Sequence, residues 1–215
     1  DIEDDGSATG TISYNEISVV NLDTGAHHPM VVGRNPHQVK FTDDSSLAIV
    51  VSDDRLALID LFASVPTRSI VEIATDLLDP PRAEEVEITP DGAYAFIRQY
   101  GQPDIVLVDL ATNEWVDSLP VQSNPTDLDI SPDGSEVVIV DRGAQKLFIY
   151  PTTNPAGSQA EIIDLPETEL LGSVTFAPDS EKAILFTTAA SISHYTTWDM
   201  TEPDPELALK TRPLV

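Results

Sequence analysis

Clustered acidic side chains are the first candidates for chemistry in this sequence. The segment DISPDGSEVVIVD, residues 129–141, holds three aspartates around a Pro-Asp-Gly turn. Carboxylates this close could act as a general acid and base, or could hold a hard cation such as Ca²⁺. The alternative is turn chemistry, because Pro fixes φ, Asp accepts a backbone hydrogen bond and Gly tolerates a positive φ.

The same turn recurs along the chain, which favours the structural alternative. Its copies are FTDDSS from Phe41, ITPDGA from Ile88, ISPDGS from Ile130 and FAPDSE from Phe176. Catalysis needs one unique arrangement, so a repeated feature predicts a structural role for its aspartate. We expect this role for Asp44, Asp91, Asp133 and Asp179, and for the aspartates of the repeated LIDL-like strings, Asp60, Asp109 and Asp199.

Other kinds of catalytic or metal site find less support in the sequence. The chain has no Cys, which excludes disulfides, thiolate metal ligands and a cysteine nucleophile. Its four His form no His-x-His or Glu-x-x-His pair, and no Gly-x-Ser-x-Gly is present. The acidic start, DIEDDGSATG, lacks the later Glu of an EF-hand loop. We therefore expect no catalytic residue, no metal and no cofactor.

The elements that must position these residues are short strands. In the third repeat, β-branched and apolar runs predict strands at 127–131, 136–141, 146–150 and 161–164. A repeat of roughly 40–50 residues with four strands is typical of a β-propeller blade. The expected blades lie within one domain, 1–215, and span about 8–33 (a three-stranded partial blade), 36–74, 83–121, 125–165 and 172–210.

The repeat resembles the YVTN-type, or surface-layer-type, β-propeller repeat, a relative of WD40-like propellers. The resemblance rests on Pro125, Ser131-Pro132-Asp133-Gly134, the run Val137–Val140 and the string Val108-Asp109-Leu110-Ala111-Thr112, although the Tyr-Val-Thr-Asn tetrapeptide itself is absent. It implies an all-β fold of four-stranded antiparallel blades and a seven-bladed ring. It does not imply one activity, since such propellers include enzymes, electron-transfer subunits and binding scaffolds.

Two forms of ring are open for the four full blades and the partial one. In the first, Leu214 and Val215 supply the missing strand of the partial blade and close a five-bladed ring. In the second, the chain is part of a seven-bladed ring completed by further sequence or by a second chain. We expect the second form, because two residues would be a weak clasp for a ring that must hide its edges.

The charge balance limits the class of partner. Asp and Glu number 37 against 11 Lys and Arg, giving a net charge of −26. Nucleic acid and anionic membranes need a positive footprint, so neither is expected as a partner. No apolar run reaches the roughly 18 residues of a membrane span. The chain begins at Asp1 without Met, as expected for a processed mature chain or for a piece of a longer one. The acidity and the lack of Cys favour an exported protein, periplasmic, cell-surface or secreted.

Arginine is the feature that points to a binding surface. In this repeat scheme, loops between second and third strands and loops between blades emerge on one face, and Arg212 is also assigned to such a loop. Arginine binds carboxylate and phosphate bidentately, so we expect an anionic group there. The alternative is that these arginines neutralise local acids such as Asp53, Asp54 and Asp141. The candidate binding residues are Arg34, His37, Arg55, Arg82, Arg98, Tyr100 and Arg142.

The sequence thus favours a non-enzymatic propeller scaffold that binds a protein or an anionic ligand through its loops. One alternative is an enzyme or enzyme subunit on the same fold, lactonase-like or similar to the propeller subunit of a quinone-dependent dehydrogenase. Another is a structural module of the cell envelope or surface layer.

Overall fold

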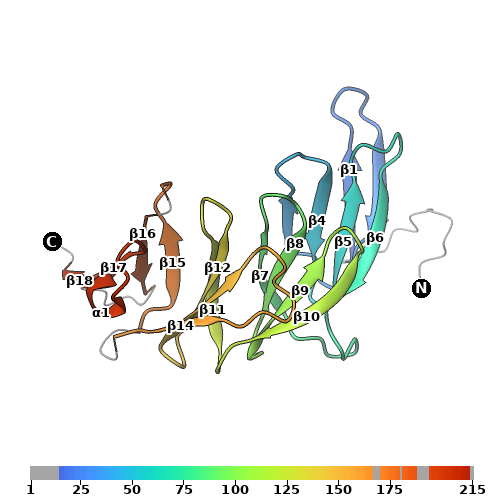
Figure 1. Cartoon of the computed structure of the whole chain (residues 1–215). Coiled ribbons are helices and arrows are strands. Elements are labelled where there is room, and N and C mark those ends of the chain that lie inside the picture. The colour runs from blue at the N-terminus through green and yellow to red at the C-terminus, as the bar shows by residue number, and fades with distance from the viewer. Residues whose placement is uncertain (1–14, 167–169, 180, 188–193, 214–215) are drawn as a thin grey trace. The chain divides into compact units, whose positions relative to one another are not determined.

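The structure is a computed structural model, and it describes residues 15–166, 170–179, 181–187 and 194–213 (Figure 1). The chain forms two compact units, Asp1–Ala83 and Glu84–Val215. Among the described residues, their regular elements are antiparallel strands, apart from one helical turn, α1 (Pro205–Ala208). In the described part of the chain, no helix has the length and apolar character needed to cross a membrane.

The first unit holds a hairpin and one four-stranded sheet. The hairpin pairs β1 (Glu16–Val20) with β2 (His27–Val31). Sheet I contains β3 (Gln38–Phe41), β4 (Leu47–Val51), β5 (Arg55–Asp60) and β6 (Thr67–Glu72), in that order. Met30 and Val32 pack with Val50 and Ala57 of sheet I, so the hairpin covers one side of the sheet.

The second unit holds three four-stranded sheets, each in chain order from its first to its fourth strand. Sheet II contains β7 (Ala83–Ile88), β8 (Tyr94–Gln99), β9 (Asp104–Asp109) and β10 (Glu114–Pro120). Sheet III contains β11 (Pro125–Ile130), β12 (Glu136–Asp141), β13 (Lys146–Pro151) and β14 (Glu161–Asp164). Sheet IV contains β15 (Ser173–Phe176), β16 (Lys182–Phe186), β17 (His194–Asp199) and β18 (Leu209–Pro213).

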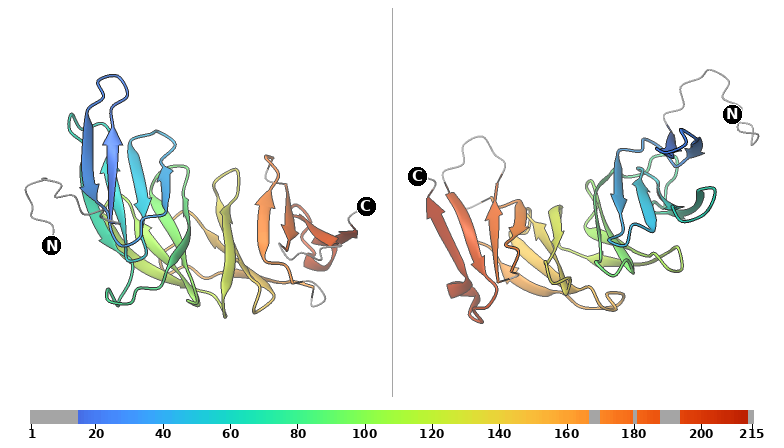
Figure 2. Two further views of the ribbon diagram at one scale, coloured as in Figure 1. Left: turned by 180° about the vertical axis from the view of Figure 1, so that it is seen from behind. Right: turned by 90° about the horizontal axis from the view of Figure 1, so that it is seen from above.

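Stacking of these sheets explains why their central strands are apolar on both faces. In β12, Val137 and Ile139 pack toward sheet II with Phe96, whereas Val138 and Val140 pack toward sheet IV with Leu185. Figure 2 shows the neighbouring sheets of the second unit in two further views. All four side chains of the Val137–Val140 run are fully buried. A strand covered on both faces is expected to read as a continuous apolar run.

The expectation of four-stranded antiparallel sheets is confirmed. In sheet III the predicted 136–141 and 161–164 agree with β12 and β14, and the other two strands agree to within two residues. Of the three strands expected in the partial blade, about 8–33, the first (8–14) lies outside the described residues, as do the closing residues Leu214 and Val215. The loop position expected for Arg212 is wrong, because Arg212 pairs with Tyr195 on the outer strand β18.

Candidate functional site

The Pro-Asp-Gly turns have the hydrogen bonds of turn chemistry. Asp133 Oδ1 accepts from the Ser131 hydroxyl at 2.7 Å and from the Ser135 N–H at 3.1 Å, and Asp91 Oδ1 accepts from Thr89 and Ala93 in the same way. The hydroxyl bonds, followed by the backbone bonds, lower the pKa of both aspartates. A methyl group on Gly134 (φ 73°) would lie 2.8 Å from Pro90, so the two turns lie side by side. We call this end of the sheets the turn end.

At the opposite end, the loop end, Asp141 organises the connection between sheets II and III. Its carboxylate accepts hydrogen bonds from the Ser123 hydroxyl and from four backbone N–H groups, those of Gln122, Ser123, Asn124 and Ala144, at 2.6–3.2 Å. The residue is fully buried. Burial by itself would raise its pKa, but these donors together lower it. Asp141 is therefore a structural residue and is not available to a ligand.

Two further carboxylates at the loop end link the first strands of neighbouring sheets. Glu85 Oε2 accepts from the N–H of Leu128 at 3.2 Å, joining sheet II to sheet III. Asp127 Oδ2 accepts from the N–H of Val174 at 2.7 Å, joining sheet III to sheet IV. Both bonds tie a side chain of one sheet to the backbone of the next. We call Glu85 and Asp127 the latch carboxylates.

Arg98 completes the latch at the junction of sheets II and III. Its guanidinium contacts Glu84 Oε2 at 2.6 Å and Glu85 Oε2 at 3.1 Å, and donates to the Pro125 carbonyl at 3.4 Å. Burial and then the neighbouring charge of Asp127 raise the pKa of Glu85 to about 7, although Arg98 acts in the opposite direction. Burial also raises the pKa of Asp127. Arg98 therefore neutralises carboxylates inside the interface between sheets II and III, and its side chain is only 12% exposed.

In the first unit, Arg55, Arg34 and His37 have partners within the unit. The Arg55 guanidinium contacts Asp54 Oδ2 at 2.6 Å, which is the local neutralisation that the sequence left open. Arg34 is exposed and donates to the Leu78 carbonyl at 2.9 Å. His37 Nδ1 lies 3.0 Å from the Asn35 carbonyl and 3.9 Å from Asp53. Arg82 is exposed in the connection between β6 and β7.

Arg142 differs from these arginines. It lies in the β12–β13 loop, partly exposed, and its buried Nε has no hydrogen-bond acceptor. Its guanidinium covers the backbone of Gly172, so closely that a methyl group there would collide with it. Tyr100 is 64% exposed in the β8–β9 loop. The loop end of this unit therefore brings Arg98 and Arg142 to adjacent sheets, but only Arg142 keeps hydrogen-bonding capacity for an anion.

The latch carboxylates were not predicted as a site, yet the repeat contained a signal for them. Aligning the turns places Glu85 and Asp127 at the same position of their repeats, six residues before the turn aspartate. Gln38 holds the same position in sheet I, where its Oε1 is buried without a donor, and Ser173 holds it in sheet IV. A polar side chain in a buried first strand needs a partner, and for Glu85 and Asp127 the backbone of the next sheet's first strand supplies one. Among the described residues, no three His, Cys, Asp or Glu side chains are placed to hold a metal ion.

Comparison with known proteins gives a likeness in fold. No family model and no curated protein matches the sequence. Hydrazine synthase from Kuenenia stuttgartiensis superposes with a TM-score of 0.62 and 15% identity over 97% of this chain and 53% of that one. Dihydro-heme d1 dehydrogenase NirN in complex with DHE superposes with a TM-score of 0.68 and 14% identity, over 94% of this chain and 42% of that one.

A third structure, the Cps50 (Swd1) β-propeller domain of Myceliophteria thermophila, gives a TM-score of 0.64 and 13% identity over 93% of this chain and 66% of that one. The chain thus spans about half of the hydrazine synthase chain and less than half of NirN. Similarity at this level of identity concerns the fold alone. With its four-stranded antiparallel sheets, the chain has the β-propeller fold.

Proposed function

We propose that the protein is a non-enzymatic β-propeller scaffold that binds a partner through the loop end of its sheets, with Arg142 as the residue that receives an anionic group. The single observation that supports this is the contrast among the arginines. Arg55 and Arg98 bind carboxylates of the chain itself, whereas the Nε of Arg142 has no acceptor. The Nε itself is buried, so an anion would approach the exposed part of the guanidinium, whose charge is not neutralised by an ion pair with any carboxylate of the described residues.

The class of ligand follows from the guanidinium. A planar fork of N–H donors matches a carboxylate or a phosphate better than a neutral group. The surrounding charge of −26 repels extended polyanions, so the anionic group must be single and placed on a small ligand or on one side chain of a protein partner.

The experiment follows the backbone amide resonance of Gly172, which the Arg142 guanidinium covers, by NMR while inorganic phosphate, and separately acetate, is added. We expect a saturable shift, and we expect Arg142→Lys to weaken phosphate binding at least about ten-fold because one point charge replaces the bidentate fork. Arg68→Lys, at an exposed arginine on β6, serves as the matched control and keeps wild-type binding. Absence of saturation, or equal losses in both variants, would refute the anion site.

The proposal includes export and a second chain or further sequence that completes the ring. It draws on the acidic, Cys-free composition and on the repeat count, which is lower than the seven blades of the family that the repeat resembles. Mass spectrometry of the protein isolated from its native source tests both points. A signal-processed chain carrying or co-isolating with further repeats supports them, and a cytoplasmic chain of these repeats alone contradicts them.

A catalytic function is the second candidate, and the latch carboxylates are the observation that favours it. A carboxyl with a pKa of about 7 next to a second carboxylate is suited to general acid–base catalysis near neutral pH. A panel of lactones tests this class of reaction. If the wild type hydrolyses a lactone and Glu85→Gln loses this activity while remaining folded, the protein would be an enzyme rather than a scaffold.

A further inference from the structure

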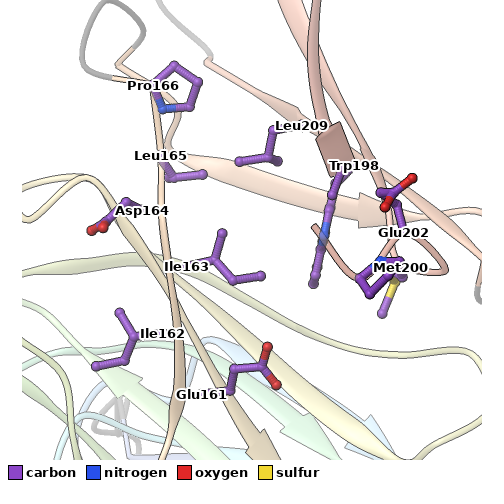
Figure 3. Close-up of a pocket in the computed structure, with 12 residues that line it drawn as sticks. Glu161, Ile162, Ile163, Asp164, Leu165, Pro166, Trp198, Met200, Glu202 and Leu209 are labelled. Atoms are coloured by element: carbon purple, nitrogen blue, oxygen red, sulfur yellow. The ribbon is translucent and has the colours of Figure 1, made fainter. Parts of the chain in front are cut away.

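A lateral groove in the second unit is built differently from the loop end. It has a volume of about 660 Å³ and lies between the outer strand β14 of sheet III and the end of β17, α1 and β18 of sheet IV. Figure 3 shows Ile163, Leu165 and Leu209 pointing into the space beside the Trp198 ring. Trp198 is 4% exposed and Ile163 is 8% exposed, so the floor of the groove is apolar and firmly held.

The rim of this groove is acidic. Glu161 stands at one end of β14, and Glu202 lies on the opposite side next to Met200 (Figure 3). Asp164 also lines the groove, but its carboxylate is bound to Lys146. Glu136 on β12 adds a further negative charge near Glu161, and burial, followed by the charge of Glu161, raises its pKa. A cation placed here would relieve that repulsion.

The backbone of β14 is the third component. In the described part of the chain, β14 pairs with β13 only, so its outer edge leaves alternate N–H and C=O groups without a strand partner. An edge strand of this kind can accept an extended peptide as an additional strand, with pockets beside it that receive alternate side chains. The groove lies along this strand.

We propose that the groove binds an extended protein segment in which an apolar side chain is flanked by lysine or arginine. The segment adds to the edge of β14, its apolar side chain enters the space before Trp198, and its basic side chains approach Glu161 and Glu202. Charge complementarity selects this occupant. A second copy of a chain with a net charge of −26 would bring acid against acid, and so would the chain's own start, DIEDDG.

The site is independent of Arg142 and takes the opposite charge. Fluorescence can therefore test it in a Trp115→Phe background, where Trp198 is the remaining tryptophan of the two. The probes are a short synthetic peptide with a central leucine flanked by lysines, the same peptide with glutamates in place of lysines, and a version N-methylated at alternate residues. We expect saturable binding of the lysine peptide alone.

Charge reversal at the rim supplies the matched comparison. Glu161→Lys with Glu202→Lys should weaken the lysine peptide at least about ten-fold at low salt. Glu72→Lys with Glu114→Lys changes the same net charge at exposed residues on the outer strands β6 and β10, and should leave binding within about two-fold. Both pairs of substitutions replace side chains outside the buried core, so the fold is expected to persist.

Several results would overturn the proposal. If binding of the lysine peptide does not saturate, the proposed site does not exist. If both double variants lose affinity equally, the peptide is held only by the overall charge of the protein. Undiminished binding of the N-methylated peptide excludes pairing with β14. Concentration-dependent dimerisation in sedimentation, abolished by the Glu161 and Glu202 changes, would assign the groove to a second copy instead.

Discussion

Two sets of carboxylates at opposite ends of the sheets of the second unit have pKa values shifted in opposite directions. At the turn end, Asp91 and Asp133 are exposed and accept a hydroxyl and a backbone N–H, so their pKa values are lowered. At the loop end, Glu85 and Asp127 are half-buried between sheets and their pKa values are raised. Position in the repeat therefore sets the role, and the balance of burial against donors sets the charge state.

Asp141 shows that donors can outweigh burial at the loop end. It is more buried than the latch carboxylates, yet five donated hydrogen bonds keep its pKa low. Glu85, by contrast, accepts hydrogen bonds from only one backbone N–H and from the Arg98 guanidinium, and the nearby charge of Asp127 opposes its ionisation. The comparison predicts three effects of decreasing size.

The largest effect is expected for Asp141→Ala. The substitution leaves several buried backbone donors without an acceptor, so we expect a loss of about 3–5 kcal/mol in the free energy of unfolding, measured by urea denaturation. Asp133→Ala at the exposed turn end should cost no more than about 1 kcal/mol. Asp141→Asn keeps one acceptor oxygen and should fall between the two. Equal losses in the two alanine variants would break the distinction between the ends.

The second effect is a pH dependence at the latch. The pKa of Glu85 is raised from 4.5 to about 7 on folding, so its contribution to stability is full below pH 4.5 and is lost as the pH rises through 7. Relative to Glu85→Gln, the wild type should lose on the order of 2 kcal/mol between pH 4.5 and 8. Thermal unfolding across this range measures the slope. Glu114→Gln, an exposed change on β10, should keep the wild-type slope, and a Glu85→Gln variant with that same slope would contradict the latch assignment.

The fold was predictable from the sequence because turn chemistry and strand composition repeat with the blade. The Asp133 turn and the Val137–Val140 strand each follow from local rules. The candidate binding residues were harder to predict. Arg98 lies in β8, seven residues after Asp91, whereas Arg142 lies in the β12–β13 loop, nine residues after Asp133, and the two have different neighbours. Glu84 and Glu85 neutralise Arg98 across the sheet, whereas Gly172, at the start of the next sheet, offers Arg142 no carboxylate. Such contacts depend on the tertiary structure, and so does the groove at Trp198.

The smallest effect is the reverse pH dependence at the turn end. Hydrogen bonds from Ser131 and Ser135 lower the pKa of Asp133 below 3.8, so its contribution to stability is present above that pH and is lost as the pH falls through the lowered value. Asp133→Asn keeps an acceptor oxygen but has no charge, and after solvent screening we expect it to cost less than about 1 kcal/mol at pH 7. The cost should shrink as the pH is lowered from 7 toward 2, because the wild-type carboxyl becomes increasingly protonated. Thermal midpoints of the two proteins at both pH values measure this difference. A cost that grows as the pH falls would give the turn aspartates the same sign as Glu85, and the two ends of the sheets could then no longer be distinguished by their titration.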